Sequence, residues 1–423
     1  MAAEKKCFDV LIVGGGPAGL AAAHRSARAG ASTGIVDDNP ALGGQIWRGE
    51  TPHNKSEAAK WLNLPRTHVE ILTGTHVFHA DARSRTLFAE SRLANFELHY
   101  NHLILATGAR ERFLPFPGWT LPNVMAAGGL QAMAKSGLAI RGKRIVVAGT
   151  GPLLLAVAAY LAKHGANVTM ICEQASFTRL VRFGLGLAAQ PSKIVQALGL
   201  RRDLAGVPFS ANTWPMKAKG NGVLQSVVLS RNGHTQELAC DYLACGFHLV
   251  PNIELLALLG CNIRNGFVEV DEFQKTSVEN VYCAGEPTAI GGLESSLLEG
   301  EIAALSATGL QDATGALRHK RGKLSSFATR LETAFTIRPD LRTLCEADTI
   351  VCRCEDVVHG RLTPHPSWRA AKLHTRCGMG PCQGRVCGPA TEFLFGWQPD
   401  SVRPPIYPAR FESLAFVEHE LGA

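Results

Sequence analysis

Phe8-Asp-Val-Leu-Ile-Val-Gly-Gly-Gly-Pro-Ala-Gly19 is the stretch of sequence that decides the fold. Phe8 to Val13 has the pattern of a short buried β-strand. Gly14, Gly16 and Gly19 then give the G-x-G-x-x-G spacing that opens a helix. The first glycine permits a tight turn, the second lets the backbone approach a pyrophosphate, and the third lets helix and strand pack closely. The helix N-terminus attracts phosphate groups, so the stretch predicts a dinucleotide-binding βαβ unit.

Asp37 completes this first unit. A second strand is expected from Ser32 to Val36, and the acid follows about 20 residues after the glycines, the usual spacing for a carboxylate that accepts hydrogen bonds from a ribose. The motif in this context predicts an adenine dinucleotide, either NAD or FAD.

A second βαβ unit is expected farther along the chain. Its predicted elements are a strand, a helix and a strand at 144–148, 153–163 and 167–172. Gly149 and Gly151 keep the first two glycines of the motif. Leu154 replaces the third glycine, so helix and strand cannot approach as closely.

Glu173 ends the second unit, at the position where an acid binds an adenosine ribose. The acid favours NAD, whereas Arg179 and Arg182 leave NADP, with its 2′-phosphate, as an option. ATP is a further candidate. A vestigial fold that keeps its glycines only for the turn would hold no nucleotide.

The cysteines are distributed unevenly along the chain. Five of the twelve lie between residues 352 and 387, and the others are scattered singly. In a reducing compartment such a concentration indicates a metal or cluster site rather than disulfides. Four thiolates suit a [2Fe–2S] cluster. Structural zinc sites usually show cysteine pairs with wider spacing than the C-x-C at Cys352 and Cys354. Zinc and free thiols are the alternatives.

Composition limits the classes of protein that this chain can be. Its 423 residues suggest roughly two to four domains. A net charge of +7, without aromatic residues interleaved among basic runs, argues against nucleic-acid binding. The N-terminus shows no secretory signal, and the apolar run 145–162 contains motif glycines and a proline rather than a membrane span. We expect a cytoplasmic protein with no transmembrane segment, with a peripheral position on the inner face of the membrane as the alternative.

Three further segments resemble the FAD signature of glutathione-reductase-like flavoproteins. They are the turn at 43–45, the strand and small-residue turn at 103–109, and the strand and acid at 281–286. In that family the late acid is usually Asp, and here it is Glu286. The resemblance spans residues 8 to about 310. It implies that FAD is bound by Gly14, Gly16, Pro17, Ala18, Gly19, Asp37, Gly44, Gln45, Thr107, Gly108, Gly285 and Glu286, and NAD(P) or ATP by Gly149, Gly151 and Glu173.

Disulfide reductases of this architecture carry a redox-active C-x-x-C pair beside the flavin. No such pair occurs in this sequence. The single cysteines are expected to be small buried hydrophobic residues, namely Cys172, Cys240, Cys245, Cys261 and Cys283. Electrons that leave the flavin therefore need another carrier.

The cysteine-rich segment supplies a candidate carrier. Cys352-Arg-Cys354-Glu and Thr375-Arg-Cys-Gly-Met-Gly-Pro-Cys-Gln-Gly-Arg-Val-Cys387 resemble the bacterioferritin-associated-ferredoxin-like [2Fe–2S] domain of several flavoprotein dehydrogenases. The resemblance implies that the cluster is bound by Cys352, Cys354, Cys382 and Cys387, with Cys377 as the alternate ligand.

The order of these parts is similar to that in the α or A subunits of bacterial multisubunit amine and imino acid dehydrogenases, which include opine oxidase, proline and hydroxyproline dehydrogenases and hydrogen cyanide synthase. The resemblance implies an electron-transfer subunit of a complex that oxidises the CH–NH or CH–NH₂ group of an opine, D-hydroxyproline, proline, sarcosine or glycine. It also implies a companion flavin subunit of the D-amino-acid-oxidase type and a quinone or other acceptor. Further options are a small third subunit, and an FMN at a subunit boundary. We assign no catalytic residue, because no histidine stands in a motif typical of a general acid or base.

The expected fold is α/β, with two Rossmann-like dinucleotide-binding domains and a small α-rich [2Fe–2S] domain near the C-terminus. The predicted boundaries are 1–118 with 247–312 for the FAD domain, 119–246 for the inserted second domain, 313–344 for a linker, 345–400 for the cluster domain and 401–423 for a tail. Two rival functions stay open: a self-contained NAD(P)H-dependent reductase with FAD and a cluster, and an assembly subunit whose nucleotides are structural.

Overall fold

The chain forms two compact units, and each is described by itself. The computed structural model describes residues 3–53, 56–65, 67–187, 191–399 and 401–421. The first unit contains Met1–Arg110, Pro251–Ala328 and Ser401–Ala423, and the second contains Glu111–Val250 and Thr329–Asp400. The cysteine-rich segment thus belongs to the second unit and the C-terminal tail to the first.

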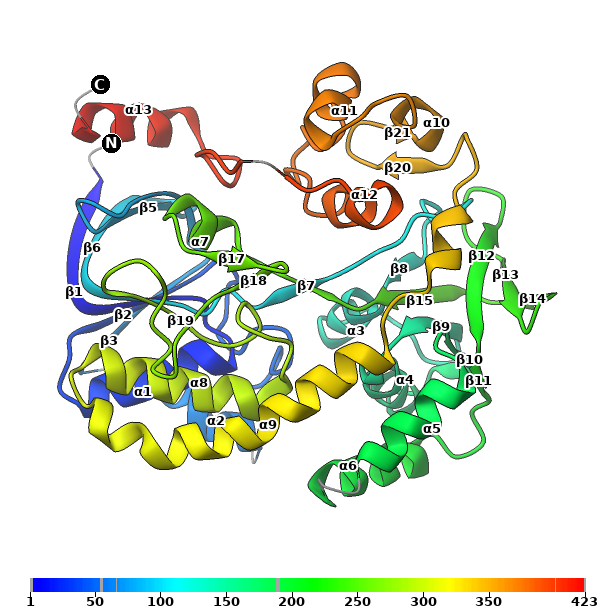
Figure 1. The fold of residues 1–423 in the computed structure, drawn as a ribbon, viewed down its shortest axis with the longest axis horizontal. Helices are drawn as coiled ribbons and strands as arrows, with labels where there is room; N and C mark the ends of the chain where they lie inside the picture. The colour runs from blue at the N-terminus through cyan, green and yellow to red at the C-terminus, as the bar shows by residue number, and fades with distance from the viewer. Residues whose placement is uncertain (1–2, 54–55, 66, 188–190, 400, 422–423) are drawn as a thin grey trace. The chain divides into compact units, whose positions relative to one another are not determined.

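A seven-stranded sheet is the centre of the first unit (Figure 1). Its strands are β1 Glu4–Val13, β2 Thr33–Asp37, β3 Val69–Thr73, β4 His76–Asp81, β5 Thr86–Glu90, β6 Asn95–Leu105 and β19 Val281–Cys283. They run in the order β3-β2-β1-β6-β5-β4, and β19 also pairs with β6. All neighbouring strands are parallel, except that β5 pairs antiparallel with both β4 and β6. Val13 is in register with Val36 and Leu105, so the carboxyl ends of the central strands share one edge.

Helices and short strands complete the first unit. They are α1 Pro17–Arg28, α2 Glu57–Leu62, α7 Glu254–Leu258, β17 Ile263–Arg264, β18 Phe267–Val268, α8 Gly292–Ala307 and α13 Phe411–Leu421. Helix α1 packs very closely against α8, because a Cβ on Gly300 would lie only 2.1 Å from the carbonyl oxygen of Ala18. The chain passes between the units within β7 Ala109–Glu111, β16 Leu249–Pro251 and α9 Gly315–Ala334, and once more before Ser401.

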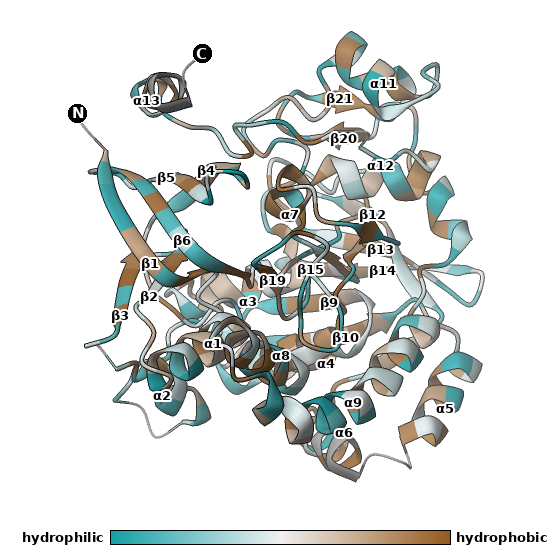
Figure 2. Ribbon diagram, turned by 60° about the vertical axis from the view of Figure 1, so that its left-hand side comes forward, coloured by the Kyte–Doolittle hydropathy of each residue, from teal (hydrophilic) through white to brown (hydrophobic). Residues whose placement is uncertain are grey.

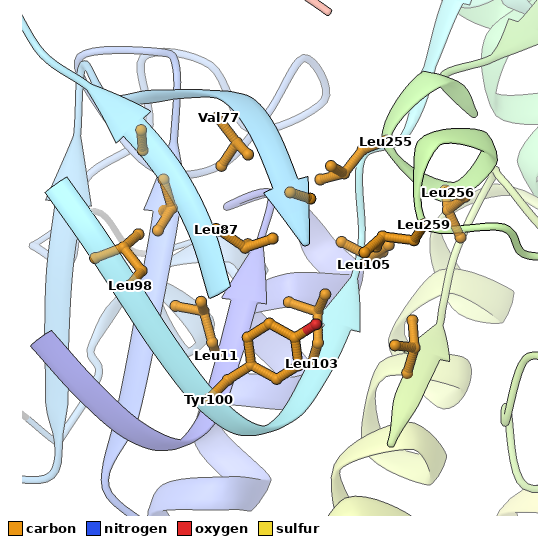
Figure 3. Packing of buried hydrophobic residues seen from close by; sticks show 14 of the residues in the cluster. Leu11, Val77, Leu87, Leu98, Tyr100, Leu103, Leu105, Leu255, Leu256 and Leu259 are labelled. Atoms are coloured by element: carbon orange, nitrogen blue, oxygen red, sulfur yellow. The ribbon is translucent and has the colours of Figure 1, made fainter. Parts of the chain in front are cut away.

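The core of the first unit follows from the apolar side chains of its strands. Figure 3 shows Leu11 of β1, Leu87 of β5 and Leu98 of β6 in one cluster, with Leu255 of α7 at its border. Figure 2 shows β1 changing from hydrophilic to hydrophobic colours along its length, because its first residues are charged and its last are apolar. The apolar end is the one that leads into the glycine turn.

The C-terminal tail is bound to the antiparallel edge of this sheet. Glu90 of β5 is 4% exposed, and its carboxylate accepts hydrogen bonds from the backbone N–H of Arg410, at 3.1 Å, and from the hydroxyl of Ser413. Apolar packing reinforces these bonds, with a small cluster made by Phe78, Phe88 and Val417. The tail is therefore part of the first unit rather than a free extension.

The second unit contains a five-stranded parallel sheet in the order β11-β10-β9-β15-β8, with the bounds β8 Val124–Ala126, β9 Arg144–Thr150, β10 Asn167–Glu173, β11 Phe209–Ala211 and β15 Tyr242–Phe247. An antiparallel sheet follows, with β12 Thr213–Lys219, β13 Ser226–Arg231 and β14 His234–Ala239. The helices are α3 Ala127–Lys135, α4 Pro152–Lys163, α5 Phe177–Gly186 and α6 Pro191–Asp203. The predicted α/β class and both βαβ units are confirmed.

The cysteine-rich part of the second unit consists of short elements. They are a 3₁₀-helix Pro339–Thr343, β20 Ile350–Cys352, β21 Val357–Val358, α10 His359–Leu362, α11 Trp368–Thr375 and α12 Cys387–Phe395. Buried side chains at Val351, Val357 and Leu362 form a small core here. Within the described ranges, none of the helices is both long and apolar enough to cross a membrane.

Leu98→Ala tests the core of the first unit. Leu98 is fully buried, so truncation removes apolar contacts and leaves a cavity, and the free energy of unfolding should fall by about 2–5 kcal/mol. Chemical denaturation followed by circular dichroism measures the change. Leu93→Ala is the matched control, because Leu93 is 85% exposed and its truncation should change stability by no more than about 0.5 kcal/mol. Equal losses in the two variants would contradict this description of the core.

Candidate cofactor-binding and cysteine sites

The turn between β1 and α1 is fixed by close contact with neighbouring strands. Gly14 has a φ of +110°, and a Cβ at this position would lie 2.1 Å from the carbonyl oxygen of Ala106. The Gly14 N–H donates to the carbonyl of Val36 at 2.8 Å, and the Ala106 N–H donates to the carbonyl of Val13 at the same distance. A side chain at Gly14 would therefore separate β1 from the chain that follows β6.

Gly16 leaves open space at the N-terminus of α1. Among the described residues, a Cβ on Gly16 would meet only the α-carbon of Gly44, at 4.0 Å. Gly44 belongs to a turn that is tied to the motif by a 2.8 Å hydrogen bond from the Gly43 N–H to the carbonyl of Gly15. Unpaired N–H groups at a helix N-terminus bind phosphate, so this open cradle fits the pyrophosphate of a dinucleotide.

Asp37 lies beside the cradle at the end of β2. Its carboxylate accepts hydrogen bonds from the N–H of Gly15 at 2.5 Å and from the N–H of Asn39 at 2.7 Å. Asn39 in turn accepts a bond from Arg48 at 2.9 Å. The acid is thus held where this fold contacts an adenosine ribose.

Two more turns meet at the same edge of the sheet. The Asn252 side chain donates to the carbonyl of Thr107 at 2.9 Å, and the Thr107 hydroxyl donates to the carbonyl of Asn252 at 2.6 Å. Glu286 accepts a hydrogen bond from the backbone of Ala109, and burial raises the pKa of its carboxyl to about 7. A Cβ on Gly108 would lie 3.9 Å from that carboxyl. The turn after β6 and the turn after β19 are therefore adjacent.

Glu299 supports the Gly285 turn from within α8. It is 2% exposed, and its carboxylate accepts hydrogen bonds at 2.8 Å from the Gly285 N–H and from the Nε of Arg321. Sequence analysis missed Asn252, Glu299 and Arg321. None of the three lies in a motif, and each contacts a residue that is distant from it in the sequence. Helix α8 contains two other glutamates, Glu294 and Glu301, so its sequence did not single out Glu299.

The structure thus brings most of the predicted first-site residues to one edge of the first sheet. Gln45 is exposed in the turn that follows Gly44. The residues that gather are Gly14, Gly16, Pro17, Ala18, Gly19, Asp37, Gly44, Thr107, Gly108, Gly285 and Glu286.

The second glycine turn connects β9 to α4. A Cβ on Gly149 would lie 1.9 Å from the carbonyl oxygen of Gly246, whereas one on Gly151 would meet no described atom within 4 Å. Glu173, at the end of β10, accepts hydrogen bonds from the N–H of Gly151 at 2.7 Å and the hydroxyl of Thr150 at 2.8 Å. It is 2% exposed, and burial raises its pKa to about 7. The predicted residues of this second site are also neighbours.

Three buried cysteines place their sulfur atoms together. The Sγ atoms of Cys352, Cys377 and Cys387 lie within 4.8 Å of one another. Cys352 ends β20, Cys377 follows α11, and Cys387 begins α12. Hydrogen bonds from the thiols of Cys377 and Cys387 hold the pKa of Cys352 well below its usual range. The group therefore offers three sulfur atoms as metal ligands.

Cys354 and Cys382 form a second group, which begins two residues along the chain from Cys352. Cys354 is hydrogen-bonded to both the backbone and the side chain of Cys382. Cys354 is exposed and Cys382 is half-buried. The four predicted ligands are thus divided between two groups. Cys377, the alternate ligand, lies with Cys352 and Cys387.

Trp368 supports the loop that carries Cys377 and Cys382. Its indole ring lies 2.6 Å from the Cβ position of Gly378 and 3.2 Å from that of Gly384, so larger residues would not fit. Sequence analysis missed this residue, because a tryptophan at the start of a helix carries no metal-site signal.

Comparison with known proteins places this geometry among oxidoreductases. Residues 8–316 match the Pyridine nucleotide-disulphide oxidoreductase family. The HcnB subunit of hydrogen cyanide synthase from Pseudomonas aeruginosa is 31% identical, over 89% of this chain and 90% of that protein. The A subunit of opine oxidase from Rhizobium meliloti is 28% identical, over 99% of this chain and 89% of that protein.

Solved structures share the fold. L-proline dehydrogenase from P. horikoshii superimposes with a TM-score of 0.68 at 18% identity, covering 98% of this chain and 80% of that chain. Thioredoxin reductase from T. acidophilum gives 0.57 at 22% identity, covering 72% of this chain and 98% of that chain. With the family match and the relatives, these observations lead to one conclusion: the chain is a flavoprotein oxidoreductase that belongs to the pyridine nucleotide-disulphide oxidoreductase family.

Proposed function

We propose that this chain is the electron-transfer subunit of a heteromeric dehydrogenase that oxidises an amino or imino acid, and that it holds FAD and a [2Fe–2S] cluster. The observation that carries the proposal is the gathering of five cysteines in a chain that has no C-x-x-C pair. Similarity to HcnB of hydrogen cyanide synthase and to the A subunit of opine oxidase supports it, because both are components of larger enzymes.

The first glycine turn would hold FAD. Gly16 and Gly44 would border the pyrophosphate, and Asp37 would accept hydrogen bonds from the ribose. Glu286, next to the Gly108 turn, would contact the ribityl chain. When bound, FAD supplies two-electron redox chemistry, and these residues bind and orient it.

The grouped cysteines would divide between two iron atoms. Cys354 and Cys382 would serve one iron, and Cys352 and Cys387 the other, which gives the four thiolates of a [2Fe–2S] site. The low pKa of Cys352 fits a ligand that must bind as thiolate. Cys377 would be a fifth, non-ligating thiol. When bound, the cluster supplies one-electron transfer.

Substrate oxidation would take place in a companion flavin subunit of the D-amino-acid-oxidase type, and a quinone or other acceptor would receive the electrons. We propose a cytoplasmic location for the complex, on or near the inner face of the membrane.

Gly16→Ala tests the FAD site. Gly16 has an extended backbone with φ −77°, so alanine fits the chain, but its methyl group enters the cradle. Weakening one charge-assisted contact to the pyrophosphate by about 1.5–3 kcal/mol should lower FAD affinity roughly tenfold or more. Flavin absorbance after dialysis measures this. Gly14→Ala should instead prevent folding, because its Cβ meets Ala106 at 2.1 Å. Full flavin content in Gly16→Ala would contradict the assignment.

Cys382→Ser and Cys377→Ser test the ligand set. Oxygen-protected wild-type protein should contain about two iron atoms and two labile sulfides per chain. Cys382→Ser should lose most of this iron, because it removes a ligand, whereas Cys377→Ser should keep it. Metal analysis and electron paramagnetic resonance of the reduced protein report the outcome. Loss of iron in Cys377→Ser but not in Cys382→Ser would show that Cys377 is the ligand. Wild-type protein without iron would contradict the proposal that the chain holds a cluster.

Reduction of the flavin separates this function from its rivals. The complex with the companion subunit is mixed anaerobically with opine, D-hydroxyproline, proline, sarcosine and glycine in turn. We expect one of these substrates to bleach the flavin and reduce the cluster. The chain alone should stay oxidised. Bleaching by NADH without a partner would favour the self-contained reductase, and a flavin that stays oxidised in the complete complex would favour an assembly role.

A further inference from the structure

A short segment of the chain covers the acid of the second dinucleotide fold. This segment, 334–338, starts at the last residue of α9 and leads toward the cysteine-rich part of the same unit. The Thr150 hydroxyl, which also donates to Glu173, lies 3.3 Å from the carbonyl of Phe335. The covering segment therefore touches the glycine turn itself.

Gln174 ties the segment down from the residue next to the acid. Its side chain is fully buried; Nε2 donates to the carbonyl of Thr336 at 3.3 Å, and Oε1 accepts from the N–H of Arg338 at 3.1 Å. The Arg338 guanidinium stacks over the Trp214 ring at 4.6 Å. Both ends of the segment are thus anchored to the second unit.

Phe335 fills the space beyond the acid. Its ring is 5% exposed and packs edge-on against Phe183 of α5, with ring centroids 5.2 Å apart. The same cluster includes Ala175, two residues after Glu173. In a dinucleotide-binding βαβ unit the adenosine lies at the acid that ends the second strand, so this aromatic ring stands where an adenosine would need room.

Arg179 is also committed to the covering segment. Its guanidinium donates to the carbonyl of Thr336 at 3.3 Å. This arginine was one of the two candidates for a 2′-phosphate, with Arg182, and the bond directs it to the backbone instead. The phosphate half of the turn stays open at Gly151, but the adenosine half is occupied by the chain.

We propose that residues 334–338 block the binding of adenosine nucleotides to the second dinucleotide fold. NAD(H), NADP(H) and ATP then bind neither at Gly151 nor at Glu173. The fold serves instead as the support on which the segment leading to the cysteines is anchored. This inference concerns the second fold alone and stands whether or not the cluster is present.

Nucleotide binding by the purified, flavin-loaded chain tests the proposal. NADH, NADPH and ATP are each titrated by calorimetry under anaerobic conditions, with the flavin spectrum recorded in parallel. We expect no saturable binding at millimolar concentration and no bleaching. Stoichiometric binding of any of the three that is lost in Glu173→Ala would overturn the proposal. Iron content does not enter this test, so its outcome is separable from that of the proposed function.

Phe335→Ala provides the converse test. Removing the ring should open the adenosine half and make NADH binding detectable, with an affinity roughly tenfold or more above the wild-type limit, because the ring no longer fills that space. Phe177→Ala, on the exposed face of α5 with 70% of its surface accessible, is the matched control and should gain nothing. A folded Phe335→Ala that still binds no NADH would overturn the role of this residue.

If Phe335→Ala fails to fold, hydrogen exchange of the wild-type chain tests the proposal instead. In the wild-type chain, the Arg338 N–H that donates to Gln174 should stay protected and unchanged when NADH or ATP is added. Nucleotide-dependent loss of that protection would show a displaceable lid, which contradicts permanent closure.

Discussion

The absence of a side chain at Gly14 is the constraint on which the first unit depends. It lets the chain after β6 approach to a distance that no Cβ would allow. The approach keeps Val13, Val36 and Leu105 in register, so that four turns end at one edge of the sheet. Gly149 repeats the arrangement against Gly246 in the second unit. The same kind of backbone contact thus positions both glycine turns, and it also fixes where the polar residues of each turn lie.

Sequence reasoning succeeded where the signal is local. The strands before both glycine motifs, helix α4 and strand β10 lie where an apolar run followed by glycine indicates them. It failed where a contact joins distant residues, because polar pairs such as Thr107 with Asn252, or Gly285 with Glu299, leave no periodic pattern. The same limit applies to the covering segment over Glu173, which comes from more than 150 residues away in the chain.

The cysteines illustrate both outcomes. Their spacing was enough to predict a site, and the structure brings all five into two neighbouring groups. Spacing could not show that Cys377 turns inward to join Cys352 and Cys387, because that depends on Trp368 packing against the glycines of the loop. The choice of ligands among the five stays a prediction.

The two dinucleotide folds, which share the glycine motif, differ in what contacts their acids. Asp37 is bonded within its own βαβ unit, and Glu173 lies under residues from a remote part of the chain.

The bonded tail has a consequence for the order in which the protein is made. Glu90, Phe78 and Phe88 leave the ribosome long before the partners that cover them, because Arg410 follows Glu90 by 320 residues and Ser413 by 323. Until Arg410 and Ser413 have emerged, a nascent chain presents an uncovered apolar strand edge and a carboxylate without these donors. The whole of the second unit and residues 251–328 of the first lie between these two parts of the sequence. Completion of the first unit therefore waits for this later segment, and the interval before it is when a chaperone would be needed.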